Sequence, residues 1–96
     1  MELKEIIQHL IGSVGEVLDM AGHNVPTITA DRKPMGIPGF DSYSGVTAIH
    51  EFEDRAKVDL SELEHLFFFD KKNRYLKVED VAKTIQEYMN RKGRKK

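Results

Sequence analysis

Three segments of the chain place apolar residues three and four positions apart, which is the spacing of one face of an α-helix. The first segment covers residues 2–20 and the second covers residues 42–56. The third closes the chain, with about twelve residues that start at Val78. No part of the chain gives a convincing sheet. The pattern therefore predicts an all-α fold in which these apolar faces form the core.

A fourth, shorter helix is expected to open at Ser61, because Ser61 and Glu64 have the spacing of a capping box. Residues 66–69 read LFFF and are interpreted as core filler, with a short strand as the alternative, and residues 70–74 as a polar turn. Lys77 precedes the last helix, at a position where Ser, Thr or Asp is favoured. The chain is thus expected to form a four-helix bundle of three long helices and one short helix.

Residues 21–40 form a long connection between the first two helices. They contain all three prolines of the chain and three of its seven glycines. Long ordered connections in small domains are usually functional or tightly packed. Four apolar residues are expected to attach this connection to the helices: Val25, Ile28, Met35 and Ile37.

The first helix contains two glycines, Gly12 and Gly15. Each weakens a helix by up to about 1 kcal/mol relative to alanine. Their place inside an otherwise periodic segment indicates that another helix packs closely against this one.

The net charge of −1 hides an uneven distribution along the chain. Residues 41–65 carry seven acids and two bases, whereas residues 71–96 carry ten bases and three acids. With 96 residues the chain is expected to form one domain, over residues 1–90. Residues 91–96 lack an apolar anchor and are expected to form a frayed, basic tail.

Several functional classes are disfavoured by what the sequence lacks. It contains no cysteine, which fits a reducing cytoplasm, and no apolar run near the ~20 residues that span a bilayer. Mixed charge from residue 2 onward does not resemble a secretory signal. We therefore expect a cytoplasmic monomer that does not insert into membranes.

Catalytic and metal-binding patterns are also missing. The sequence has neither a nucleophile elbow nor a phosphate-binding loop. Its histidines do not form the i, i+4 pair of a helical zinc site, and they lie at His9, His23, His50 and His65. His50 beside Glu51 could act as a base, but a histidine on a helix surface is usually only solvated. The chain is thus expected not to be an enzyme.

The stretch GIPGFDS, residues 36–42, leads directly into the second helix. Asp41 is a favourable N-cap, and Ser42 then occupies the first helical position. A phosphate ester on Ser42 would lie at the positive end of the helix dipole. Asp-Ser is also a common helix start, so the pair alone leaves both interpretations open.

The longer register favours the interpretation of Ser42 as an attachment site. The segment DSYSGVTAIHEFEDRAKVDL, from Asp41 to Leu60, resembles the acyl carrier protein family, in which an Asp-Ser-Leu motif opens the second helix. The register is carried by Asp41-Ser42, Val46, Ile49, Phe52-Glu53, Val58 and Leu60. The order of helices agrees with that family, and the resemblance covers residues 3–89. It implies an acyl-carrier-like bundle of four helices.

The resemblance implies that Ser42 is the attachment point for 4′-phosphopantetheine, which a separate transferase adds from coenzyme A. Asp41 would cap the helix and help the transferase recognise the site. Partner enzymes that transfer or synthesise acyl groups would read the surface formed by Tyr43, Val46, Thr47, His50, Glu51, Glu53 and Asp54. An acyl or aminoacyl group, held as a thioester, would be sheltered by Val46, Ile49, Phe52, Val58, Leu66 and Ile85.

Some positions depart from the family pattern. Tyr43 replaces the usual leucine, and Ser44 and Thr47 occupy positions where fatty-acid-synthesis members commonly have acids. The chain is also less negative than those members. These differences favour a specialised lipid, polyketide or peptide pathway over general fatty-acid biosynthesis.

Two alternatives remain from the sequence. A carrier-like fold without the prosthetic group would act as an interaction module. A small helical protein associated with nucleic acid would use the basic tail, with Arg91, Lys92, Arg94, Lys95 and Lys96 facing phosphates. No helix combines basic and base-reading residues, so sequence-specific nucleic-acid binding is less expected than nonspecific binding through the tail.

Overall fold

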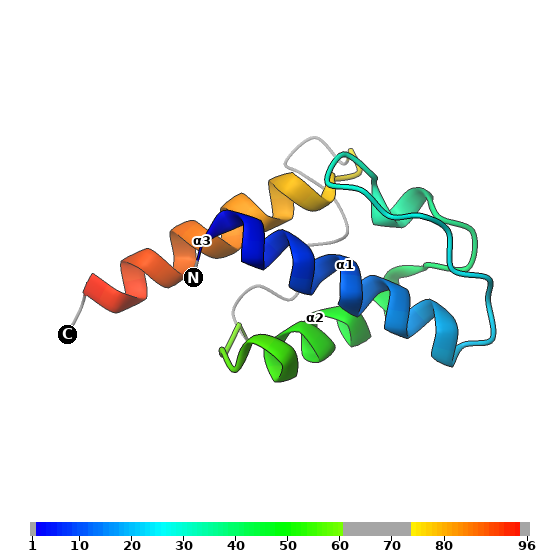
Figure 1. Cartoon of the computed structure of the whole chain (residues 1–96), viewed down its shortest axis with the longest axis horizontal. Helices are drawn as coiled ribbons and strands as arrows, with labels where there is room; N and C mark the ends of the chain where they lie inside the picture. The colour runs from blue at the N-terminus through cyan, green and yellow to red at the C-terminus, as the bar shows by residue number, and fades with distance from the viewer. Residues whose placement is uncertain (1, 61–73, 95–96) are drawn as a thin grey trace.

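The computed structural model of this chain describes residues 2–60 and 74–94, and for Ser42 and residues 92–94 it describes the backbone alone. Within these residues lie three α-helices, α1 (Leu3–Met20), α2 (Ser42–Ala56) and α3 (Val78–Arg94), one short 3-10 helix, η1 (Pro34–Gly36), and no strand (Figure 1). The all-α class is therefore confirmed. Three α-helices are described where four were predicted, because the helix expected at Ser61 lies outside the described residues, as do residues 66–69.

The sequence predicted the bounds of α1 and α2 to within one residue, but α3 is longer than predicted. It has 17 residues and includes residues 91–94, which the sequence assigned to the basic tail. Residues 91–94 include Gly93, a poor helix former, but the arginines and lysine beside it have good helix propensity, and cations near a helix C-terminus interact favourably with its dipole. The helix can therefore continue after its apolar positions end, and its last turns project beyond the other helices (Figure 1).

Helix α1 packs against both α2 and α3 and so occupies the centre of the bundle (Figure 1). Each helix contributes one apolar face to a single core. The fully buried members are Ile6, Leu10, Val14 and Leu18 of α1, Ala48 and Phe52 of α2, and Val78, Val81, Ala82 and Ile85 of α3. The ring of Phe52 meets that of His9 edge-on, with 6.2 Å between centroids and planes at 80°. No helix in the described part of the chain is both long and apolar enough to cross a bilayer.

Local hydrogen bonds fix both ends of α1. At its start the Glu2 N–H donates to Glu5 Oε1 at 3.2 Å. At its end Gly22 takes a positive φ of 82°, and two bonds close the last turn: His23 N–H to Leu18 O and Gly22 N–H to Asp19 O, each 3.0 Å. This pair of bonds defines a Schellman motif, in which glycine adopts the left-handed conformation without the steric cost of a Cβ.

The connection between α1 and α2 is attached to the core at several points, as predicted. Ile37 is buried, and Ile28 and Met35 are partly buried against the core. Val25 is 46% exposed and makes a more limited contact, since its Cγ1 lies 3.5 Å from where a Cβ on Gly15 would stand. The connection therefore packs as an ordered layer over one end of the bundle (Figure 1).

Backbone carbonyls of the same connection cap α3. The Val78 N–H donates to Arg32 O at 2.9 Å, and the Glu79 N–H donates to Ala30 O at 2.8 Å. The first N–H groups of a helix have no partner inside it and are usually satisfied by a side chain at the N-cap. Here the connection provides the acceptors, which explains why Lys77 is tolerated before the helix.

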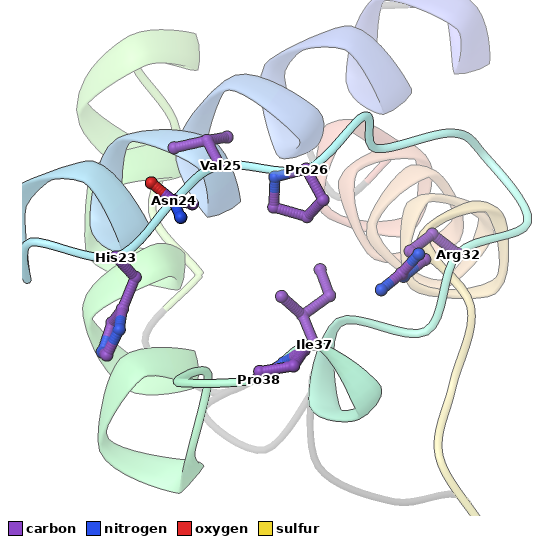
Figure 2. Close-up of a pocket in the computed structure, with 7 residues that line it drawn as sticks. All are labelled: His23, Asn24, Val25, Pro26, Arg32, Ile37 and Pro38. Carbon is purple, nitrogen blue, oxygen red and sulfur yellow. The ribbon is translucent and has the colours of Figure 1, made fainter.

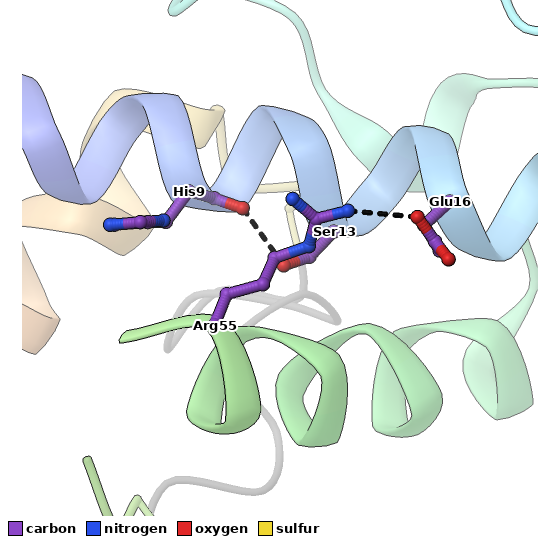
Figure 3. Close-up of polar contacts among 4 residues, drawn as sticks. All are labelled: His9, Ser13, Glu16 and Arg55. Carbon is purple, nitrogen blue, oxygen red and sulfur yellow. Dashed lines mark hydrogen bonds and ion pairs between the residues drawn. The ribbon is translucent and has the colours of Figure 1, made fainter. Parts of the chain in front are cut away.

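Among the described residues, Arg55 of α2 forms an ion pair with Glu16 of α1 (Figure 3). Arg55 Nη2 lies 2.8 Å from Glu16 Oε2, and its Nη1 lies 3.0 Å from where a Cβ on Gly12 would stand. Beside it, the buried Ser13 hydroxyl donates to His9 O at 2.8 Å. Gly12 does permit a close approach, as predicted, but an arginine side chain makes it.

Candidate functional site

The chain enters α2 through a tight turn. Gly39 has a positive φ of 89°, and a Cβ at this position would lie 2.7 Å from the imidazole ring of His23. The Phe40 N–H closes the turn onto Ile37 O at 3.0 Å, and the Phe40 side chain is buried in the core. The turn and this buried ring fix the backbone immediately before Asp41.

Asp41 caps α2, as the sequence predicted. Its Oδ1 accepts hydrogen bonds from the Ser44 N–H at 2.9 Å and from the Ser44 hydroxyl at 3.0 Å. Its backbone oxygen accepts from the Gly45 N–H at 3.0 Å. The bond from the Ser44 amide, followed by the one from the Ser44 hydroxyl, holds the pKa of the Asp41 carboxyl below its ordinary value. Asp41 is therefore ionised at neutral pH and matched to the positive end of the helix.

Ser42 is the first residue of α2, which is the position that the sequence predicted. The first turn itself contains no acidic residue, so the like charge beside an additional anion there is that of the cap, Asp41. The neighbouring Tyr43 is 82% exposed, the most open large apolar side chain of the described residues. The start of α2 thus combines a rigid entry, an ionised cap and an accessible aromatic side chain.

The seven residues expected to contact partner enzymes lie on the side of α2 that faces away from its buried residues. Tyr43, His50 and Asp54 are exposed and follow one another at steps of seven and four residues, along one helical face. Thr47 is half-buried within this face, between Tyr43 and His50, and three further residues are half-buried at its edges: Val46, Glu51 and Glu53. The Thr47 hydroxyl is engaged with the helix itself, since it donates to Tyr43 O at 3.2 Å.

Glu53 has an internal partner that the sequence did not suggest. Its Oε2 accepts a hydrogen bond from the Leu60 N–H at 2.6 Å, and its backbone oxygen accepts from the Val58 N–H at 3.2 Å. Between these positions Lys57 takes the left-handed conformation, with φ of 57°. Glu53 therefore closes the C-terminal end of α2. No local motif would have revealed this role of Glu53, because its carboxylate bonds to a residue seven positions later in the chain.

The residues expected to shelter an acyl chain are divided between the core and its edge. Ile49, Phe52 and Ile85 are buried, whereas Val46 and Val58 are half-buried. Leu66 lies outside the described residues.

A pocket of about 420 Å³ lies within the connection that precedes α2 (Figure 2). It is lined by His23, Asn24, Val25, Pro26, Arg32, Ile37 and Pro38. Of this set, the sequence marked Val25 and Ile37 as packing residues and His23 as one of four scattered histidines. The concentration of prolines was the available signal, because prolines restrict the backbone and can keep such a space open.

No three histidine, cysteine or acidic side chains come together as metal ligands in residues 2–60 and 74–94. His9, His23 and His50 are included in that statement, and His65 lies outside the described residues. Compared with protein-family models, with curated proteins and with solved structures, the chain matches none. What this site does is therefore inferred from its own geometry.

Proposed function

We propose that this protein is a noncatalytic carrier whose Ser42 hydroxyl is esterified to 4′-phosphopantetheine. The observation that carries the proposal is the start of α2, where Ser42 is the first helical residue, directly after the capping carboxylate of Asp41. In this function the protein holds an acyl or aminoacyl group as a thioester and presents it to other enzymes.

The residues at this site are compatible with such a group. A phosphodiester on Ser42 would lie at the positive end of the dipole of α2, which favours anions. Asp41 keeps the helix start formed through its two bonds from Ser44. The prosthetic group would supply the thiol that the chain, without cysteine, does not have.

The exposed face of α2 is the proposed surface for partner enzymes. Tyr43 offers an apolar contact beside the attachment point, and Glu51 and Asp54 offer negative charge further along the helix. Such charges attract basic partner surfaces and orient the encounter. The partners proposed are a phosphopantetheinyl transferase and the acyl-transferring or synthase enzymes of a specialised lipid, polyketide or peptide pathway. The proposal includes a short fourth helix from Ser61, a monomeric state and a cytoplasmic location.

The proposal is tested by intact-protein mass after incubation with coenzyme A and a promiscuous phosphopantetheinyl transferase. We expect a single phosphopantetheine adduct that is lost in Ser42→Ala. Ser44→Ala is the matched control, because it removes a hydroxyl in the same turn but keeps the amide bond to Asp41, and it should still be loaded. An unmodified wild-type mass, or an adduct that survives Ser42→Ala, would reject the carrier function. The first of these outcomes leaves the same face of α2 as an interaction module.

A further inference from the structure

The pocket within the 21–40 connection contains an arginine whose charge is not matched by an acid among the described residues. We propose that this pocket binds a small molecule with a carboxylate head and a short apolar body, and that Arg32 binds the carboxylate. Neither the carrier function nor its attachment site requires such a pocket. Four features of the pocket favour such a ligand: the main chain at Arg32, its guanidinium, the pocket walls and the position of the rim.

The main chain at Arg32 is fixed. Its carbonyl oxygen accepts the Val78 N–H at 2.9 Å and so caps α3. The side chain therefore starts from an anchored point, and it is partly buried. Because partial burial limits the rotamers of this side chain, it loses less entropy when it binds a ligand than a fully exposed arginine would.

The guanidinium of Arg32 points into the pocket toward Ile37 (Figure 2). It forms no ion pair or hydrogen bond with the described residues. Asp31, the acid that directly precedes Arg32 in the chain, instead accepts a hydrogen bond from the Thr29 hydroxyl. Because arginine stays charged at any ordinary pH, a partly buried guanidinium facing an apolar space favours an anion there.

The remaining lining defines the body of the ligand. Val25, Pro26, Ile37 and Pro38 give apolar walls, and Asn24 adds an amide. The volume of about 420 Å³ is within the range of small-molecule sites, which are mostly apolar with a few placed polar groups. A single cation matches the single charge of a carboxylate, whereas a phosphate monoester would bring more charge than this lining balances.

The rim of the pocket lies close to the start of α2. Gly39, which packs against the His23 ring, precedes Ser42 by three residues, a span of at most about 11 Å. The carboxylate could therefore come from two sources, a free acid or the far end of an acyl group carried on Ser42. Only the second source rests on the proposed carrier function.

Titration of the unmodified protein with hexanoate, followed by ¹⁵N amide shifts, tests the site. We expect saturable shifts at Asn24, Val25, Arg32 and Ile37, and much weaker binding of hexanol, which lacks the charge. Arg32→Gln should weaken hexanoate binding by about tenfold or more, as expected for a lost charged hydrogen bond. Lys33→Gln is the matched control, because it removes the same charge from an exposed neighbour outside the pocket.

Unchanged amide shifts of Val78 and Glu79 in Arg32→Gln will show that the cap of α3 is intact. Equal binding of hexanoate and hexanol would overturn the proposal. So would equal affinities of Arg32→Gln and Lys33→Gln, or shifts confined to residues away from the pocket.

The second arm identifies the source of the carboxylate. Ser42 is loaded with a six-carbon acyl group that ends either in a methyl group or in a carboxylate. A shift of the Arg32 Nε–H signal with the carboxylate group alone indicates carried cargo. No shift, together with binding of free hexanoate, indicates a free acid. If Ser42 cannot be loaded, the carrier function fails, while the hexanoate titration still decides whether the pocket binds a carboxylate.

Discussion

The starts of α2 and α3 are stabilised in different ways. At α2 the acceptor is the side chain of Asp41, which lies three residues from its donor Ser44. At α3 the acceptors are the main-chain oxygens of Ala30 and Arg32, more than forty positions earlier in the chain. The first start is set by local sequence, whereas the second requires the connection and the helix to be folded together. A change in the connection should therefore affect α3 more than α2.

The largest expected effect comes from removing one donor of this long-range cap. In Glu79→Pro the N–H that donates to Ala30 O is lost, and an unsatisfied carbonyl costs about 1–3 kcal/mol of the free energy of unfolding. Tyr43→Pro places proline at the same position of α2, where the N–H faces the Asp41 carboxylate and not a connection carbonyl. Urea unfolding of both variants should show the greater loss for Glu79→Pro. Equal losses of unfolding free energy would contradict the expectation that the start of α3 depends on the connection more than the start of α2.

A smaller effect is expected from the turn that leads into α2. Gly39→Ala places a Cβ on a residue with φ of 89°, which costs about 1–2 kcal/mol, and it also displaces the His23 ring. Gly36→Ala is the control, since nothing lies within 4 Å of its Cβ position. Thermal unfolding should show a lower Tm for Gly39→Ala and little change for Gly36→Ala. If the two variants have the same Tm, the turn does not constrain the start of α2.

Removal of the local cap should have a modest effect. Asp41→Ala loses both bonds from Ser44 and should lower the Tm by a few degrees, whereas Asp41→Asn keeps an acceptor and should lower it less. Thermal unfolding of the two variants at neutral pH, followed by circular dichroism, measures these changes in Tm. A larger loss for Asp41→Asn than for Asp41→Ala would show that the cap does not act through its acceptor.

The same carboxylate gives a pH dependence with a definite sign. Because its pKa is lowered on folding, Asp41 contributes stability that is fully present above its ordinary pKa of about 3.9. This contribution is lost as the pH falls through the lower pKa of the folded state. Acid unfolding of wild type and Asp41→Asn should therefore converge below that pH. A constant difference between the two at every pH would exclude this linkage.

The smallest effect is expected at the other end of α3. Arg91 is exposed, and the core contacts of the helix end with Tyr88 and Met89. Deletion of residues 91–96 should change the free energy of unfolding by less than about 0.5 kcal/mol, as is usual for surface changes. Chemical denaturation measures this difference. A larger loss would mean that the basic segment stabilises the bundle.

The sequence predicted the features that depend on local contacts and missed those that depend on long-range contacts. The bounds of α1 and α2, the cap at Asp41 and the place of Ser42 were predictable, because each depends on residues within one turn. Apolar spacing underestimated α3, because residues 91–94 add no apolar position to the pattern although the helix continues to Arg94.

Long-range contacts account for what the sequence missed. Gly12 indicated a close approach, but only the folded chain shows that Arg55 makes it. The carboxylate of Glu53 that holds Leu60, the carbonyls over α3 and the Arg32 pocket have no signature at the spacing of a motif. The spacing of residue types along the chain does not show which main-chain groups or distant side chains will become partners.

The carbonyls of Ala30 and Arg32 have a practical consequence for engineering. Grafting a loop from another protein in place of residues 21–40 would also exchange the acceptors on which the last helix begins. A chimera that keeps every helix intact could then still shift the first turn of that helix. Designers who recombine such segments should transfer the loop and the helix start as one module.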